Sequence, residues 1–260
     1  MKESRAKAEW VGFQTIIIRE FHRIVRIWGQ TVVPPAVTAT LYFIIFGSLI
    51  GRRVGPVGGF DYMQFIAPGL IMMSVIQNSY ANVVSSFFGA KFGKHVEELL
   101  VSPLPNWLIV SGYVAGGILR GLLVGSMVTL VALFFTHLAL THIAAILSAA
   151  FFTSAIFGLG GFINAMFAKN FDQISWFPTF VLTPLTYLGG VFYSINMLPD
   201  WAHVVSHANP ILYMVSAFRY GFLGTSDVDL RLAFAIMVGA AAAMFALAVA
   251  LLNRGAGIRE

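Results

Sequence analysis

The sequence predicts an all-α protein that crosses a membrane several times, and composition is the first observation behind this. Of its 260 residues, 58% are hydrophobic and only 10% are charged, which is too little polar surface to cover a water-soluble globule of this size. The second observation is the length of the apolar runs, because a bilayer core of about 30 Å needs about 20 residues of helix. The third is that these runs lack the alternation of barrel strands, and a helix satisfies its own backbone groups in lipid.

Six segments are long enough to cross the bilayer as helices. They are residues 31–50, 62–88, 107–135, 142–167, 174–193 and 231–252. Six crossings place both termini on one side, together with the connections 89–106 and 168–173. That side carries eleven Lys and Arg residues against four on the other, so we expect it to be cytoplasmic.

Residues 1–30 precede the first predicted span as a cytoplasmic N-terminus. From Trp10 to Gln30, arginines recur at helical spacing on one face and apolar side chains recur on another. The arginines are Arg19, Arg23 and Arg26, and the apolar residues are Ile17, Phe21, Ile24 and Trp28. We expect an amphipathic helix in the cytoplasmic interface, with its arginines suited to anionic lipid head groups. A soluble helix packed on a partner is the alternative.

A charged insert follows the second predicted span. Lys91, Lys94, Glu97 and Glu98 fall within eight residues, and burying them in the bilayer would cost on the order of 10 kcal/mol, so the insert lies outside it. Its pattern HVEELLVSPLP predicts a short helix along the membrane surface that ends at Pro103. Neighbouring helices need about two to six connecting residues, so a helical insert indicates a docking partner. A plain connecting turn is the alternative.

The insert does not read as a nucleotide-binding loop. In GAKFGKH, three residues rather than four separate the glycines, and His95 stands where a Ser or Thr is required. The basic residues of the chain are also spread along a hydrophobic sequence instead of forming one face, which argues against nucleic-acid binding. With no cysteine, the chain has neither a thiolate metal site nor a cysteine nucleophile.

The third predicted span carries Arg120 near its middle. A charge at that depth is costly and normally faces a cavity or a polar partner, so Arg120 is a candidate for a translocation pathway. The alternative is a structural arginine held by carbonyls or by neighbours such as Ser126 or Asn164. Around it lies a stripe of small residues that predicts close helix packing, namely Gly112, Gly116, Gly117, Gly121 and Gly125.

The fifth predicted span is interrupted by Pro178 and Pro184. Proline removes a backbone donor and bends a helix, and the hydroxyls threaded through this span can bond to the freed carbonyls. We therefore expect it to line a pathway between subunits, with plain helix packing as the alternative. The pathway candidates here are Thr179, Thr183, Pro184 and Tyr187.

The outer connection, residues 194–224, is too long and too apolar for a simple loop. Asn209 followed by Pro210 favours a helix start, which predicts short helices that re-enter the membrane from outside. His203 and His207 are four residues apart, but a zinc site of the HExxH type has Glu beside the first His, where this chain has Val204. We expect no metal here and take His203, His207, Asn209 and Pro210 as external gate candidates.

Three stretches together resemble the ABC-2 class of ABC transporter membrane subunits, and the resemblance covers nearly the whole chain. They are EELLVSPLP, FPTFVLTPLTYLGGVFYSINMLP and HANPILYMVSAFRYGFLG. The resemblance implies an exporter half in a bacterial inner membrane: a homodimer beneath which two copies of a separate nucleotide-binding ATPase subunit dock. ATP and Mg²⁺ would belong to that partner, and this chain would bind no cofactor.

The resemblance also divides the chain into parts. Residues 31–252 would form the transmembrane domain and 253–260 a cytoplasmic tail. The coupling helix of the family maps onto about 93–103, with Lys94, Glu97, Glu98, Leu99, Leu100, Ser102 and Pro103 as contact candidates. A lipid, a lipid-linked glycan or a hydrophobic drug would suit an apolar path.

Two other classes of function remain as alternatives. A membrane-embedded enzyme or lipid-modifying protein would use His203, His207 and Asp200, although no GxSxG nucleophile turn occurs. A secondary transporter would carry ionisable residues within its spans for ion coupling, and only Arg120 qualifies.

Overall fold

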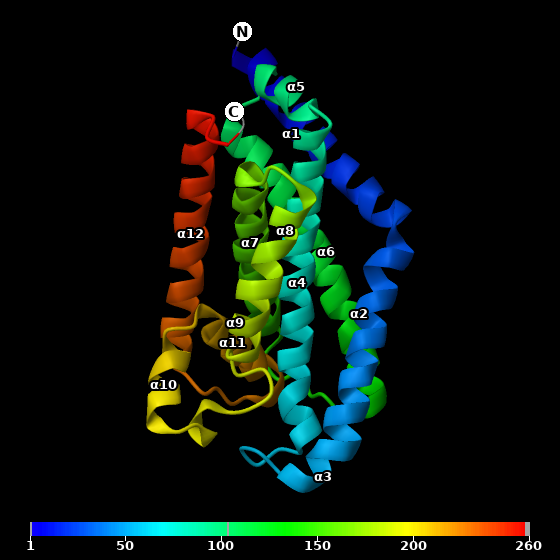
Figure 1. Ribbon diagram of the computed structural model, residues 1–260, viewed down its shortest axis with the longest axis vertical. Helices are drawn as coiled ribbons and strands as arrows, with labels where there is room; N and C mark the ends of the chain where they lie inside the picture. Colours follow the sequence, from blue (N-terminus) through cyan, green and yellow to red (C-terminus); the bar gives the residue numbers. More distant parts are fainter. Residues whose placement is uncertain (1, 103, 258–260) are drawn as a thin grey trace.

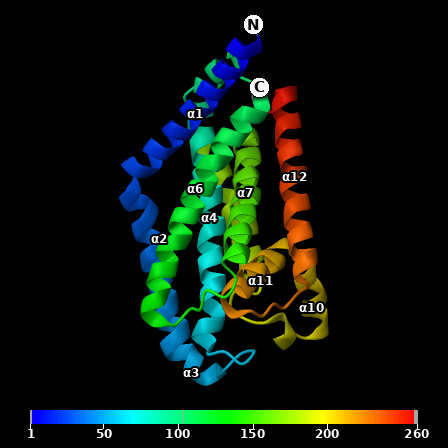
Figure 2. The same ribbon diagram turned by 180° about the vertical axis from the view of Figure 1, so that it is seen from behind.

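The computed structural model describes residues 2–102 and 104–257, without the side chains of residues 2–6, 48, 49, 52, 100 and 196. Long helices run side by side, with the N- and C-termini and α5 at one end and α3 and α10 at the other (Figures 1 and 2). Within the described ranges there is no β-strand beyond an isolated bridge between Val57 and Phe60. The predicted all-α class is confirmed, and the charged insert lies at the same end as both termini.

The elements occur in the following order along the chain. They are α1 (Lys2–Arg26), α2 (Trp28–Tyr42), the π-helix η1 (Phe43–Ile50), α3 (Gly51–Val54), α4 (Tyr62–Phe92), α5 (His95–Val101), α6 (Asn106–Phe135), α7 (Ile143–Phe167), α8 (Phe171–Phe177), the π-helix η2 (Pro178–Leu182), α9 (Thr183–Tyr187), the 3₁₀ turn η3 (Ile195–Met197), α10 (Asp200–His207), α11 (Pro210–Leu223) and α12 (Leu230–Arg254).

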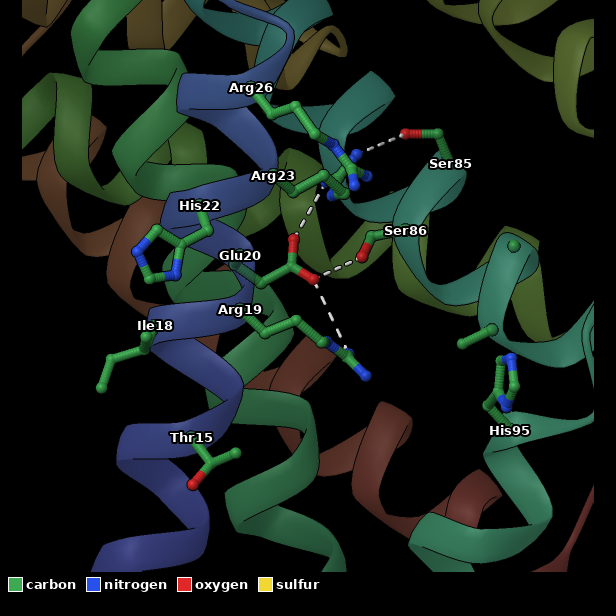
Figure 3. A pocket seen from close by; sticks show the side chains of 12 residues that line it. Thr15, Ile18, Arg19, Glu20, His22, Arg23, Arg26, Ser85, Ser86 and His95 are labelled. Carbon is green, nitrogen blue, oxygen red and sulfur yellow. Dashed lines mark hydrogen bonds and ion pairs between the residues drawn. The ribbon is translucent and has the colours of Figure 1, made fainter.

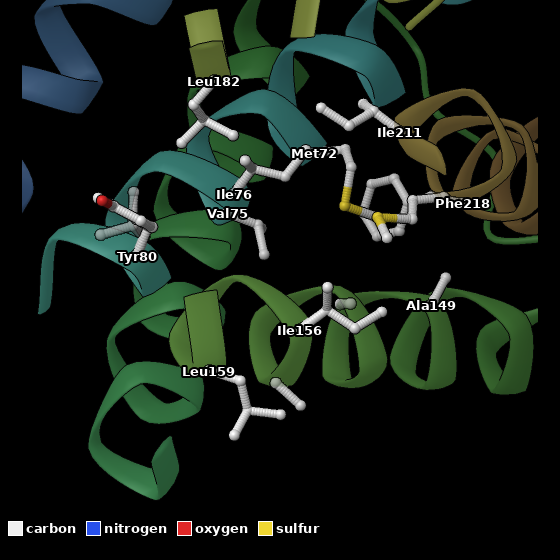
Figure 4. Packing of buried hydrophobic residues seen from close by; sticks show 14 of the residues in the cluster. Met72, Val75, Ile76, Tyr80, Ala149, Ile156, Leu159, Leu182, Ile211 and Phe218 are labelled. Carbon is white, nitrogen blue, oxygen red and sulfur yellow. The ribbon is translucent and has the colours of Figure 1, made fainter. Parts of the chain in front are cut away.

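The core of the molecule lies between α4 and its neighbours α6, α7 and α11. Figure 4 shows side chains of α4, α7 and α11 that meet in this core, including Met72, Ile156 and Phe218, all of them buried. The glycine stripe of α6 makes this closeness possible. A Cβ on Gly121 would lie against the Ser79 and Ser154 hydroxyls, and one on Gly117 would meet Val83. The predicted packing role of these glycines is confirmed.

The count of six spans stays a prediction. In the described part of the chain, four helical segments are long and apolar enough to cross a membrane: Trp28–Gly47, Asn106–Phe135, Ile143–Phe167 and Leu230–Arg254. Helix α4 has 31 residues but contains many polar ones. The helix of the fifth predicted span stops at Tyr187 instead of continuing to residue 193, because Gly190 follows with a left-handed φ of 73°.

The connection at the end opposite the termini returns into the bundle. Helix α11 packs against α4, α7 and α12, and most of its side chains are buried. Arg219 on α11 is fully buried and donates to the carbonyls of Phe65 and Gly190 and to the carboxylate of Asp227, 3.0 Å away. One guanidinium thereby ties α4, the turn after α9 and the loop after α11 together.

The chain begins as a bent arm along one side of the bundle. Helices α1 and α2 meet at a bend near Ile27, and both views show α2 beside α6 (Figure 2). Large apolar side chains on this arm, such as Trp10, Phe21 and Trp28, are exposed. Between this arm and α8, one face of α4 stays accessible (Figure 1).

Candidate functional site

One face of α4 carries small and polar residues and is accessible, although this helix is the centre of the bundle. Ser74, Gln77, Ala81, Ser85 and Gly89 follow one another every three or four residues, and each is half-buried or exposed. Residues on the other faces of the same helix are buried. A stripe with helical spacing thus opens to the outside along about four turns.

Three cavities follow this stripe from one end of the molecule towards the other. The first is about 220 Å³ and lies between α2 and α4, and the second, of about 500 Å³, lies between α4 and α8. The third, of about 880 Å³, lies between α1 and α4. Gln77 lines the first two and Ser85 the last two, so neighbouring cavities share walls on α4. We call this series the α4 groove.

The helices on both sides of the α4 groove depart from regular α geometry. Pro34 and Pro35 lie inside α2, which continues into the π-helix η1, and Pro178 begins the π-helix η2 on the other side. Hydroxyls bond to backbone carbonyls as expected: Thr179 donates to Ser175 and Thr183 donates to Pro178, each at 2.8 Å. Short π segments of this kind are frequent at functional sites.

Two of the fifth-span candidates line this groove. Thr179 and Thr183 line the cavity between α4 and α8, together with Pro178. Pro184 lies in the first turn of α9, where its missing donor interrupts no bond within that helix. Their placement agrees with a pathway, and their role in transport stays a prediction.

A pair of tyrosines spans the α4 groove near its far end. The hydroxyls of Tyr42 at the end of α2 and Tyr187 at the end of α9 are 3.3 Å apart. Phe192 contacts both rings, with centroid distances of 5.9 Å and 5.7 Å, and stacks on Phe46 at 4.7 Å. This cluster joins the two proline-containing helices across the face of α4.

The cavity nearest the termini is lined by arginines. Figure 3 shows Arg19, Arg23 and Arg26 on α1 directed towards the gap that Ser85 and Ser86 on α4 face, whereas His22 projects to the other side of α1. His95, at the start of α5, lies across this gap. We call this cavity the arginine pocket.

A buried carboxylate holds α1 against the bundle at this point. Glu20 is 1% exposed, forms a 2.9 Å ion pair with Arg23 and accepts a hydrogen bond from the Ser86 hydroxyl. Arg23 also donates to the side-chain and backbone oxygens of Asn82 at 2.8 and 3.0 Å. Gly116 on α6 permits this approach, because a Cβ there would lie 2.9 Å from the Glu20 Cβ.

The orientation expected for α1 is therefore wrong in one respect. Arg19 and Arg23 do not both project to lipid head groups, because Arg23 bonds to α4 and Arg19 donates to the Tyr113 hydroxyl of α6 at 2.7 Å. Ile24, expected on the lipid face, is buried, while Phe21 and Trp28 are exposed. The reason is Glu20, whose burial beside the bundle draws the arginines inward.

Helix α5 carries the candidates of the charged insert. It is anchored by Val96, which is buried, and by Leu99, which packs partly against the core. Glu97 and Glu98 point away, are exposed and form no ion pair within the described part of the chain. Val101 is 88% exposed beside them, an apolar contact residue that the sequence pattern did not single out.

The remaining residues of the insert fix the ends of α5. Lys94 precedes the helix in a left-handed conformation, with φ of 61°, and the Ser102 hydroxyl donates to the Leu99 carbonyl at 2.6 Å. The side chain of Leu100 and the whole of Pro103 lie outside the described residues.

Arg120 lies on α6 and does not line the three cavities of the α4 groove. Its Nε atom is buried without a hydrogen-bond partner, and the positive charge of Arg23 is close enough to repel it. Of the two structural partners considered, Asn164 instead bonds to the Tyr80 hydroxyl at 2.6 Å. Its role in a pathway stays a prediction.

The external gate candidates separate into two groups. The rings of His203 and His207 lie 4.6 Å apart, and no group of three His or acidic residues able to hold a metal occurs among the described residues. Asn209 caps α11 by accepting from the Ile211 amide at 3.0 Å and donates to the Leu185 carbonyl of α9 at 2.7 Å. Pro210 takes the first position of α11, as expected.

Three features of the site were not predicted from the sequence: the polar face of α4, Glu20 and Tyr42. The α4 stripe had a readable signal, since Ser74, Gln77, Ala81 and Ser85 recur at helical spacing inside a predicted span. For Glu20 the sequence signal is weaker, namely an acidic residue among the arginines of α1. For Tyr42 there is no sequence signal, because its partner Tyr187 is 145 positions away.

Comparison with known proteins places this architecture among membrane transporters. The sequence pattern described as "ABC-2 type transporter" matches residues 11–223. The chain is 55% identical to the "Inner membrane transport permease YadH" of Escherichia coli K12 over 251 residues, which is 96% of this chain and 98% of that protein. It is 26% identical to "Nodulation protein J" of Rhizobium leguminosarum bv. viciae, over 82% of this chain and 83% of the relative. The match to "Nodulation protein J" of Sinorhizobium fredii is also 26%, over 83% and 82% of the two chains.

Proposed function

Because this chain belongs to the ABC-2 type transporter family, as a multi-pass transport permease of the inner membrane, we propose that it is the membrane-spanning subunit of an ATP-driven exporter. A separate ATPase subunit, present in two copies, binds ATP and Mg²⁺ and powers it. The chain itself is not an enzyme. The observation that carries the proposal is the α4 groove, an accessible polar face in the centre of an otherwise apolar bundle.

The α4 groove is the half-pathway that this subunit contributes. Its polar face is accessible from outside the bundle, so a second copy of the chain facing it would enclose a path between the two grooves. Thr179, Thr183 and Tyr187 would line that path, and Pro184 would keep the flanking helix broken. The apolar residues that share the walls suit a lipid, a lipid-linked glycan or a hydrophobic drug-like substrate.

Helix α5 is the contact for the ATPase subunit. Its inward face is fixed by Val96 and Leu99, whereas Glu97, Glu98 and Val101 are free to meet a partner. An apolar residue flanked by carboxylates suits a socket with Lys or Arg at its rim. Since α5 follows α4 directly, a displacement of α5 would reach the α4 groove.

The test is a double substitution, Glu97→Ala with Glu98→Ala. Truncating one member of a buried interfacial charge pair costs about 2–5 kcal/mol, so we expect co-purification of the ATPase to fall by about 30-fold or more and ATP-driven transport to be lost. Membrane insertion and dimer formation should persist. The measurements are the amount of ATPase retained and transport in proteoliposomes.

Asp200→Ala is the matched control, because it removes an exposed carboxylate from the short helix α10 at the opposite end. It should leave both quantities unchanged. The chain purified without its partner should not hydrolyse ATP. Wild-type co-purification and transport in the double variant would show that α5 is only a connector.

A further inference from the structure

The arginine pocket holds more positive charge than the protein balances. Arg19, Arg23 and Arg26 line it, together with a single carboxylate, that of Glu20. Glu20 is already engaged by Arg19, Arg23 and Ser86, and Arg120 on α6 adds a fourth positive charge that acts on Arg23 from outside the pocket. Arg23 is half-buried and Arg19 and Arg26 are exposed, and the described residues of the pocket supply one carboxylate for the three guanidinium groups.

Donors in the pocket also lack acceptors. The Nε atom of Arg23 is buried without a hydrogen-bond partner, and Arg26 makes no hydrogen bond or ion pair with the described residues. The Ser85 hydroxyl on the opposite wall accepts from Arg23 at 3.4 Å and donates to the Asn82 carbonyl at 3.1 Å. Guanidinium donors that converge on one space of about 880 Å³ are suited to an anion with several oxygens.

The surroundings of the pocket indicate what carries that anion. Ser85 also lines the adjoining cavity of about 500 Å³ between α4 and α8, whose walls include Tyr80, Val84, Ile174 and Pro178. A cationic pocket continues into a mainly apolar one at the same level of α4. A molecule that fills both has a charged head and an apolar tail.

We propose that the arginine pocket binds the phosphate head of an anionic amphiphile, with its acyl or prenyl chain in the adjoining cavity. A phosphomonoester presents three terminal oxygens, which Arg26, the Nε atom of Arg23 and the remaining donors of Arg19 can share, whereas a carboxylate presents two. This inference rests on the proposed exporter function, and it narrows the substrate to phosphate-bearing amphiphiles. A neutral drug-like molecule would leave the arginines unpaired.

Binding is measured on the full-length protein purified in a neutral detergent without the ATPase. The probe is dioctanoyl phosphatidic acid, compared with dioctanoylglycerol, which has the same tails without phosphate, and with inorganic phosphate, which lacks tails. We expect phosphatidic acid to bind at least about tenfold more tightly than either, and to weaken as salt is raised. Equal affinity for dioctanoylglycerol would overturn the phosphate site, and equal affinity for inorganic phosphate would overturn the amphiphile.

Arg26→Gln is the decisive variant, because Arg26 lines the pocket without holding the bundle together. It should weaken phosphatidic acid binding by about tenfold, since a hydrogen bond to a charged group is lost, and Arg26→Lys should restore part of it. Arg254→Gln, at the exposed last turn of α12, is the matched control and should bind as the wild type does. Equal binding by Arg26→Gln and Arg254→Gln would overturn the assignment.

The outcome separates the two proposals. If phosphatidic acid shows no preferential binding that depends on Arg26 but ATP-driven transport is intact, the phosphate site is overturned and the exporter function is retained. Phosphatidic acid binding that depends on Arg26, in a protein that neither retains an ATPase nor transports, supports the site and overturns the exporter.

Discussion

Helix α4 has two sides that are built differently. Towards α6 and α7 it meets glycines, and the helices approach so closely that a Cβ on Gly161 of α7 would lie 2.6 Å from the Tyr80 carbonyl. Towards α2 and α9 it meets prolines, π-helical turns and cavities that together follow about half of its length. Both sides come from the same apolar composition. Small residues allow α4 to pack tightly against α6 and α7. Prolines on the other side prevent tight packing of α2 and α9 against α4 and leave cavities there.

The difference matters for transport because a closely packed interface has few alternative arrangements. Interiors at crystal-like density transmit displacement instead of absorbing it. Helices interrupted by proline or π turns can bend at the interruption with little loss of hydrogen bonding. The glycine-rich interface of α4 with α6 and α7, which we call the glycine seam, is therefore suited to hold these three helices as one rigid body. The proline-containing helices α2 and α9 on the other side of α4 are suited to bend.

The largest effect should come from filling the glycine seam with Gly121→Val. The new side chain would collide with Ser79 and Ser154 on two helices, and overpacking of this kind costs about 3 kcal/mol or more when backbones must shift. We expect most of the protein to be lost as aggregate in size-exclusion chromatography. Gly239→Val on α12, where nothing lies within 4 Å of the added Cβ, should be tolerated. If both variants elute like the wild type, the seam is not rigid.

A smaller effect is expected at Arg120, which lies behind the groove on α6. If it serves the pathway, Arg120→Ala should lower ATP-driven export by about tenfold while insertion and dimer formation persist, and Arg120→Lys should restore part of the rate by keeping the charge. Export is measured in proteoliposomes beside the yield of folded dimer. Loss of folded protein in both variants would assign Arg120 to the seam instead.

The smallest effect on stability is expected for the tyrosine pair that spans the groove. Tyr42→Phe or Tyr187→Phe removes one exposed hydrogen bond, worth about 0.5–1.5 kcal/mol at most, so thermal unfolding should shift by no more than a few degrees. The rate of transport should change more clearly, because the two helices lose their link across α4. A double variant identical to each single variant in both measurements would support the link. Additive effects would indicate that the hydroxyls act separately.

Local patterns in the sequence predicted the parts of this architecture that depend on nearby residues. Glycine spacing predicted close packing of α6, proline and threonine in the fifth span predicted a broken helix with satisfied carbonyls, and Asn209 with Pro210 predicted the start of α11. Each of these depends on contacts within a few residues or on the shape of one helix face.

Features that depend on distant partners were not readable. The amphipathic pattern of α1 correctly predicted a helix, but its direction is set by Glu20, whose partner Ser86 is 66 positions away. Arg219 is one of the four positive charges that the sequence places on the outer side, and nothing in its local pattern predicts its bonds to Phe65 and Gly190, which span 154 and 29 positions. Leu99, a contact candidate on α5, packs partly against the neighbouring bundle and its contact role stays a prediction, whereas Val101, which the sequence pattern did not single out, is exposed.

The contacts of Glu20 and its neighbouring arginines also set an order of events during biosynthesis. Arg23 bonds to Asn82, 59 positions later, and Arg19 to Tyr113, 94 positions later. Ribosomes add about 5–20 residues per second, so α1 leaves the ribosome seconds before its partners have been made. Until then its carboxylate and guanidinium groups keep their water. The first helix to be synthesised thus reaches its final place only after α4 and α6 have inserted, and its docking marks a chain in which these two helices are in place before the later α7 and α12 are needed.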